Sequence, residues 1–195
     1  MNKQRVLTGA VAAAALFGAT GATCTPTPTS DPNIPAVYVL AFRQEGTAQG
    51  AQEHHQPGAS FTVDRSFLGA NKADIRVYGK EDPGPGVQHL SVALTARGTC
   101  STKVNSRGQF VTAPSPLNVT GPTLTENAPA GQVQSFLAAS LDTALAGEHS
   151  CGTHRYNGMD SAQEFFLDSG TWTAVATVDN CCGGQGTGTF TIKVT

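Results

Sequence analysis

The sequence predicts an all-β domain. Charged residues make up only 13% of the 195 residues, and glycine occurs 22 times. Low charge combined with many glycine, threonine and valine residues is typical of extracellular β-rich domains rather than helical ones. Beyond residue 35, apolar residues recur with a period of two in several stretches, and no stretch shows a convincing amphipathic helical pattern.

The first 23 residues have the three parts of an export signal. Lys3 and Arg5 form a positive region, an alanine-rich apolar run follows from Val6 to Phe17, and "GATGAT" supplies small residues for cleavage. Residues 24–35 are a Thr/Pro-rich tether, which is stiff and extended. The sequence therefore predicts a signal peptide over 1–23, a linker over 24–35 and one folded domain over 36–195.

Cys24 lies where a bacterial lipoprotein carries its lipidated cysteine. It is the odd one of five cysteines, and the extended tether follows it directly. The positions three before and one before it hold Gly21 and Thr23, which match the usual lipidation pattern only in part. Two expectations stay open: a lipoprotein anchored through Cys24, or a secreted protein cleaved near Gly21 or Ala22.

The first half of the domain contains a strand over residues 36–43, a polar loop over 46–58 and a short strand within 60–70. The stretch 73–98 predicts a hairpin around "DPGPG" at 82–86, because proline and glycine there favour a turn. Ile75, Val77 and Gly79 share one face of its first strand. Leu90, Val92 and Leu94 form the apolar face of its second strand.

The second half is less uniform. Residues 99–132 predict short edge strands and loops, and 133–150 fit either a helix or a strand. A long polar loop is expected over 151–163. Residues 164–180 and 186–195 predict three strands, with a tight turn at Ser169 and Gly170. Trp172 to Val178 and Phe190 to Val194 each present alternate residues to one face.

Two stretches resemble bacterial immunoglobulin-like domains of secreted and surface proteins. "IRVYGKEDPGPGVQHLSVAL" resembles the B strand, B–C loop and C strand, and "FFLDSGTWTAVATVDN…GTGTFTIKV" resembles the E, F and G strands. The resemblance implies an Ig-like antiparallel β-sandwich decorated by long loops. It also implies a stalk, adhesion or binding module, whose partner would be a protein or glycan at the cell surface.

The remaining cysteines are candidates for disulfides, because an exported protein enters an oxidising compartment. They are Cys100, Cys151, Cys181 and Cys182. The Ig-like arrangement implies a bridge from Cys151 to Cys181 or Cys182, with Cys100 taking the other cysteine. The competing arrangement pairs Cys100 with Cys151 and Cys181 with Cys182, although a bridge between adjacent cysteines strains the backbone.

A metal or redox site is the alternative from another class of function. "EHSCGTH" places His149, Cys151 and His154 close together, and the last hairpin could add Cys181 and Cys182. Thiolates with imidazoles suit Zn²⁺ or copper, although the spacing matches no known zinc motif. Glu81, Asp82 and Asp179 lie in two loops that the Ig-like fold places together, where turn formation or Ca²⁺ binding would suit them.

Other functions find little support. There are 12 basic and 14 acidic residues without a basic run, so no nucleic-acid partner is expected. No G-x-S-x-G, H-E-x-x-H or P-loop motif occurs, and no paired carboxylates stand out. We therefore expect a non-enzymatic, cofactor-free binding or structural module of the bacterial envelope, with membrane contact only through Cys24.

Overall fold

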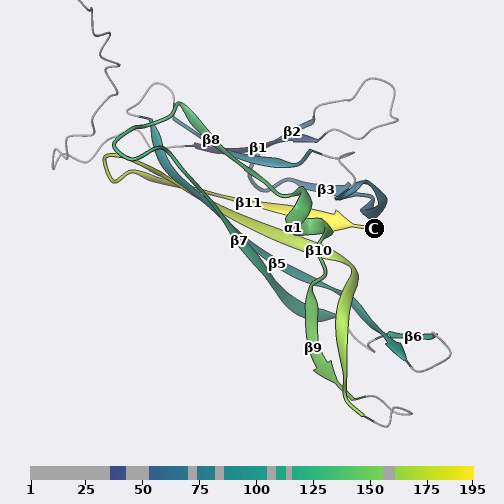
Figure 1. Cartoon of the computed structure of the whole chain (residues 1–195). Helices are drawn as coiled ribbons and strands as arrows, with labels where there is room; N and C mark the ends of the chain where they lie inside the picture. Colours follow the sequence, from purple (N-terminus) through teal and green to yellow (C-terminus); the bar gives the residue numbers. More distant parts are fainter. Residues whose placement is uncertain are drawn as a thin grey trace, which may run out of the picture.

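The computed structural model describes residues 36–42, 53–69, 74–81, 86–104, 109–112, 116–155 and 161–195 (Figure 1). These residues form strands with two short helical turns, which confirms the all-β prediction. The signal segment, the tether and Cys24 lie outside the described residues, as does most of the "DPGPG" turn.

One sheet has four strands in the order β2-β1-β4-β8, and all of its neighbours are antiparallel. The predicted first strand is confirmed as β1. The strands are β1 (Ala36–Phe42), β2 (Glu53–His55), β4 (Arg76–Lys80) and β8 (Phe136–Ser140).

The other sheet has seven strands, with the main order β3-β11-β10-β5-β6. β7 also pairs with β5, β9 pairs with β10, and β3 lies parallel to β11. The strands are β3 (Ser60–Val63), β5 (Val87–Val104), β6 (Gln109–Thr112), β7 (Leu117–Asn127), β9 (Ser150–His154), β10 (Gln163–Asn180) and β11 (Gln185–Val194).

The two sheets pack face to face over one core. A Cβ added to Gly79 on β4 would lie 2.5 Å from Val178 Cγ2 on β10, so only glycine allows this close approach. Alternate residues along the long strands are buried, as their period of two predicted. The largest buried side chains are Trp172, Phe165, Phe190, Ile75, Leu90 and Leu94.

The predicted hairpin over 73–98 is wrong. β4 pairs with β1 and β8, whereas β5 pairs with β10 and β7 in the opposite sheet. Gly86, at the end of the predicted turn, does have a positive φ of 94°, a conformation that glycine adopts readily. Each strand has one apolar face, and the crossing between sheets places these two faces opposite each other in the core.

The predicted tight turn at Ser169 and Gly170 is also wrong, because β10 runs unbroken through both residues. Buried residues are odd-numbered up to Leu167 and even-numbered from Trp172 onwards. Leu167 pairs with Cys100 and Ser169 pairs with Thr99, so Asp168 is an extra residue on β10. This β-bulge shifts the inward face by one residue without ending the strand.

Arg65 fastens the bulge to the rest of the fold. It begins the short 3-10 turn η1 (Arg65–Phe67), whose preceding Asp64 accepts a hydrogen bond from the Ser66 N–H at 2.8 Å. The Arg65 guanidinium donates to the Leu167 carbonyl at 2.9 Å and also to the Asp168 carbonyl. These bonds satisfy carbonyl groups that the interrupted ladder leaves available.

Residues 133–150, which fitted helix or strand, contain both. β8 ends at Ser140, and the short helix α1 (Asp142–Ala146) follows it directly. Leu141 at their junction and Leu145 within α1 are both buried in the core. The expected polar loop over 151–163 is likewise a strand in part, because β9 includes residues up to His154.

Part of the large sheet extends beyond the small one. In Figure 1, β9, β6 and the ends of β5 and β10 that pair with them run away from the four-stranded sheet. β5 is 18 residues long, in place of the short strands expected after residue 98. This projecting region carries two of the cysteines.

Candidate functional site

The adjacent cysteines lie at the tip of the β10–β11 hairpin, as expected. The Asn180 N–H donates to the Gly184 carbonyl at 2.9 Å and closes a loop of Cys181, Cys182, Gly183 and Gly184. Gly183 has a φ of 86°, a conformation that favours glycine. The glycines beside the cysteines therefore serve the turn geometry.

The Asn180 side chain organises this loop from beneath. Its Oδ1 accepts hydrogen bonds from the Cys182 N–H at 2.9 Å and the Gly184 N–H at 2.7 Å. Its Nδ2 donates to Glu81 Oε1 at 3.1 Å. Asn180 and Glu81 are both buried, so the hairpin is locked to the end of β4 by a shielded polar contact. The segments that carry Glu81 and Asp179 thus meet as expected, although Asp179 lies in β10 and not in a loop; Asp82 lies outside the described residues.

The two sulfurs at the tip have different states. Cys181 is disulfide-bonded, and Cys182 is a free, half-buried thiol. Their Sγ atoms are 3.4 Å apart, too far for a bond between them. The competing prediction of a Cys181–Cys182 bridge is therefore wrong for this structure, although the sulfurs are in contact.

The disulfide between Cys100 and Cys151 corrects the first choice of pairing. Cys100 on β5 and Cys151 on β9 have Cα atoms 6.4 Å apart and are 51 residues apart in sequence. Both strands pair with β10, so the bridge ties its two neighbours together. The competing arrangement was right about this pair. Cys151 lies on β9, which pairs with the same end of β10 as the Cys100 end of β5, and not at the tip of the β10–β11 hairpin.

The proposed metal ligands do not come together. Cys151 lies on β9 between residues that pair with Phe165 and Phe166, whereas Cys181 follows Asn180 at the other end of β10. At about 3.3 Å per residue, that separation is about 45 Å along the strand. Among the described residues, no group of three or more His, Cys, Asp or Glu side chains could hold a metal ion.

The two histidines of the proposed cluster have structural contacts instead. The His149 Nε2 lies 2.7 Å from the Ala144 carbonyl, and its ring packs edge-on against Trp172. The His154 Nε2 lies 2.8 Å from the Cys151 carbonyl, and its ring packs against Phe165. With Cys151 bonded to Cys100, the cluster has lost its central thiolate.

The outer face of the large sheet is a hydroxyl-rich surface that the sequence analysis missed. Paired residues on neighbouring strands share a face. One row crosses five strands as Thr120, Thr95, Thr173, Thr191 and Ser60. The available signal was the series of outward-facing threonines at alternate positions, which are Thr171, Thr173 and Thr177 on β10 and Thr187, Thr189 and Thr191 on β11.

The next row adds positive charge to this surface. It runs Asn118, Arg97, Thr171, Lys193 and Thr62 across the same strands. Arg97 and Lys193 are exposed and line a recess of about 580 Å³ over the β10 bulge. Of the residues described, no acidic side chain lines this recess. We call these two rows, from β7 to β3, the threonine face.

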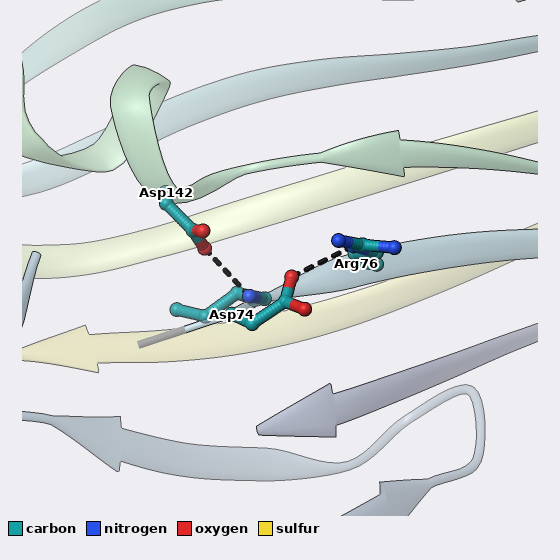
Figure 2. A network of polar contacts seen from close by, with 4 residues as sticks. Asp74, Arg76 and Asp142 are labelled. Atoms are coloured by element: carbon teal, nitrogen blue, oxygen red, sulfur yellow. Dashed lines mark hydrogen bonds and ion pairs between the residues drawn. The ribbon is translucent and has the colours of Figure 1, made fainter. Parts of the chain in front are cut away.

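A polar network joins α1 to the start of β4 (Figure 2). The Asp142 carboxylate accepts a hydrogen bond from the Ile75 N–H at 2.5 Å, and Arg76 Nε donates to Asp74 at 2.7 Å. Burial raises the pKa of Asp142, and the Asp74 charge adds to this effect, while the Ile75 N–H and Arg76 oppose it. The Asp142 carboxylate accepts its hydrogen bond from the backbone of Ile75, so we assign this network a structural role that holds α1 to the start of β4.

Asp142→Asn should change the pH dependence of stability. A raised folded-state pKa contributes stability below the unfolded-state pKa, and this contribution is lost as pH rises through the folded-state value. Asparagine keeps the acceptor for Ile75 without the charge. The free energy of unfolding of the variant relative to wild type should therefore increase as pH rises from below the ordinary aspartate range to above it, measured by urea unfolding.

Asp64→Asn is the matched control. The Ser66 hydrogen bonds lower the pKa of Asp64, so its contribution is present above the unfolded-state pKa and is lost as pH falls. The stability of this variant relative to wild type should decrease as pH rises. Identical pH profiles for the two variants would contradict both assignments.

Comparisons with known proteins identify no relative: no family model, no curated protein and no solved structure matches this chain. Within the described part of the chain, none of the helices is long and apolar enough to span a membrane. The function is therefore inferred from the fold and its surfaces.

Proposed function

We propose that this protein is an exported, non-enzymatic binding module of the bacterial cell envelope, built on an Ig-like β-sandwich. Its ligand would be an acidic, hydroxyl-rich surface glycan. The observation that carries the proposal is the threonine face, with Arg97 and Lys193 beside the recess.

The strand order supports the Ig-like assignment. In this assignment β1, β4 and β8 would correspond to strands A, B and E of one sheet, and β11, β10, β5 and β7 to strands G, F, C and C′ of the other. In this assignment strand E is β8, and residues 164–170 extend strand F. The projecting region with β6 and β9 would be the decoration of the sandwich.

Export is supported by the cysteines and the N-terminal sequence. A disulfide between Cys100 and Cys151 suits an oxidising compartment, where exported proteins fold. The residues of the predicted signal segment precede a Thr/Pro-rich tether, which would hold the domain away from a surface. The proposal covers two forms of the exported protein, one anchored through a lipidated Cys24 and one secreted.

Binding is supported by the chemistry of the threonine face. Threonine hydroxyls both donate and accept hydrogen bonds, as sugar hydroxyls do. Neighbouring strands space them about 4.8 Å apart, which gives a regular array. Arg97 and Lys193 would pair with carboxylate or phosphate groups, and the recess would receive a substituent between them.

The double variant Arg97→Gln/Lys193→Gln tests this proposal. Purified protein is sedimented with isolated cell walls of its host and, separately, retained on dextran sulfate or neutral dextran. We expect wild type to bind the cell walls and dextran sulfate but not neutral dextran. The variant should bind about tenfold more weakly, the equivalent of about 1.4 kcal/mol.

Arg76→Gln/Lys80→Gln is the control with the same loss of charge on the other sheet. Arg76 is exposed and paired with Asp74, so its loss costs little stability. This control should bind like wild type. Equal weakening in both double variants would attribute binding to net charge alone and would overturn the assignment of the threonine face.

A further inference from the structure

The hairpin tip places a free thiol against a sulfur that is already oxidised. Cys182 Sγ lies 3.4 Å from Cys181 Sγ, and Cys181 is disulfide-bonded. A thiolate that attacks a disulfide sulfur must first reach contact distance from it. Both residues are only partly buried.

We propose that Cys181 and Cys182 form a thiol–disulfide exchange site. Cys182 loses its proton and its thiolate attacks Cys181 Sγ. The Cys181–Cys182 bond forms, the present bond of Cys181 breaks, and the departing sulfur leaves as a thiolate that takes up a proton. One disulfide and one thiol are present before and after, so no outside oxidant or reductant is needed.

The loop around the cysteines is suited to this step. Asn180 Oδ1 holds the Cys182 N–H and the Gly184 N–H, so the backbone of the attacking residue is fixed. Gly183 already has positive φ, and a bridge between adjacent residues requires an unusual backbone conformation. The buried contact of Asn180 with Glu81 anchors the loop while the sulfurs exchange.

Counting the cysteines limits which sulfur can depart. The chain has five cysteines; Cys100 and Cys151 bond each other, and Cys182 is free. The departing sulfur therefore belongs to Cys24, which lies outside the described residues, or to another molecule. Exchange would release from the hairpin the segment or molecule that carries the departing sulfur. A lipidated Cys24 has no sulfur valence left for such a bond.

Peptide mapping without reduction tests the proposal. The full chain is held at pH 6 or pH 8, and samples are quenched with acid and N-ethylmaleimide before trypsin digestion. Cleavage at Arg155 and Lys193 gives a peptide of residues 156–193 that holds both Cys181 and Cys182 and no other cysteine. Its mass distinguishes a cross-linked, maleimide-labelled form from a free form with an internal bridge.

We expect conversion from the first form to the second, at least about tenfold faster at pH 8 than at pH 6, because only the thiolate attacks. The label should move from Cys182 to the departing cysteine. A labelled peptide ending at Arg43 identifies that cysteine as Cys24, and loss of a disulfide-linked dimer identifies a second chain. Either result supports the exchange.

Cys182→Ser removes the nucleophile and should stop conversion, with Cys182→Ala as a second variant if serine disturbs folding. The Cys100–Cys151 bridge is the internal control and should stay intact in every sample. The proposal is overturned if Cys182 stays labelled and Cys181 stays cross-linked at pH 8. It is equally overturned if the serine and alanine variants convert at the wild-type rate.

Discussion

Cys100→Ala/Cys151→Ala should lower the free energy of unfolding by about 4 kcal/mol. The bridge closes a loop of 51 residues, and the chain-entropy relation gives about that value for a loop of this length. It also joins β5 and β9 in the projecting region, where the four-stranded sheet adds no second layer (Figure 1). This region should lose its structure first.

Guanidinium unfolding without reductant, followed by far-UV circular dichroism, measures this effect. Cys182→Ser is the control, since Cys182 is free in this structure and lies away from the Cys100–Cys151 bridge, and it should alter stability by less than about 0.5 kcal/mol. Hydrogen exchange should show faster exchange in β9 than in β11 for the double variant. Equal stability of wild type and the double variant would show that the bridge does not constrain the fold.

Trp172→Ala should cost about 3–5 kcal/mol, the range observed when large buried aromatic residues are truncated. Trp172 is only 1% exposed and is the one tryptophan in the chain. Its ring contacts His149 edge-on, and a Cβ added to Gly121 would lie 2.6 Å from it. The cavity left by alanine would therefore border β7, β10 and the segment after α1.

Val175→Ala is the matched control on the same strand. Val175 is 42% exposed and faces the opposite side of β10, so its truncation should cost less than about 1 kcal/mol. Both variants are measured by denaturant unfolding with circular dichroism, because Trp172→Ala removes the fluorescent probe. A loss below about 1 kcal/mol for Trp172→Ala would contradict this prediction. It would mean that the two sheets move together and fill the cavity.

The sequence predicted the inward positions of the strands well. The alternation of Ile75, Val77 and Gly79, and of Leu90, Val92 and Leu94, matches the buried faces of β4 and β5. The sequence pattern predicts the buried face because side chains on a strand alternate between its two faces, whichever strand it pairs with. The hairpin at residues 180–184 was equally local, since asparagine and glycine specify such a turn.

Strand partners could not be predicted in this way. The same pattern in β4 and β5 fits a hairpin within one sheet or a crossing between two. The change of phase near Ser169 fits a turn or a bulge, and Arg65 contributes to the bulge from a distant part of the chain. The pairing of Cys100 with Cys151 follows from these partners, which is why an error in strand assignment became an error in the disulfide.

The candidate site divides in the same way. The hairpin with Cys181 and Cys182 was visible in the sequence, but the different states of its two sulfurs were not. The threonines of β10 and β11 were visible one by one. Their alignment with Arg97 and Lys193 depends on the register of five strands.

By itself, the sequence determined the class of fold, the faces of the strands and the place of the last turn, because these depend on neighbours within a few residues. The tertiary structure decided which strands pair, which cysteines bond and which polar side chains share a surface. Those features depend on contacts between distant residues, and the requirement to bury both sheets against each other selects among the many pairings that local patterns allow.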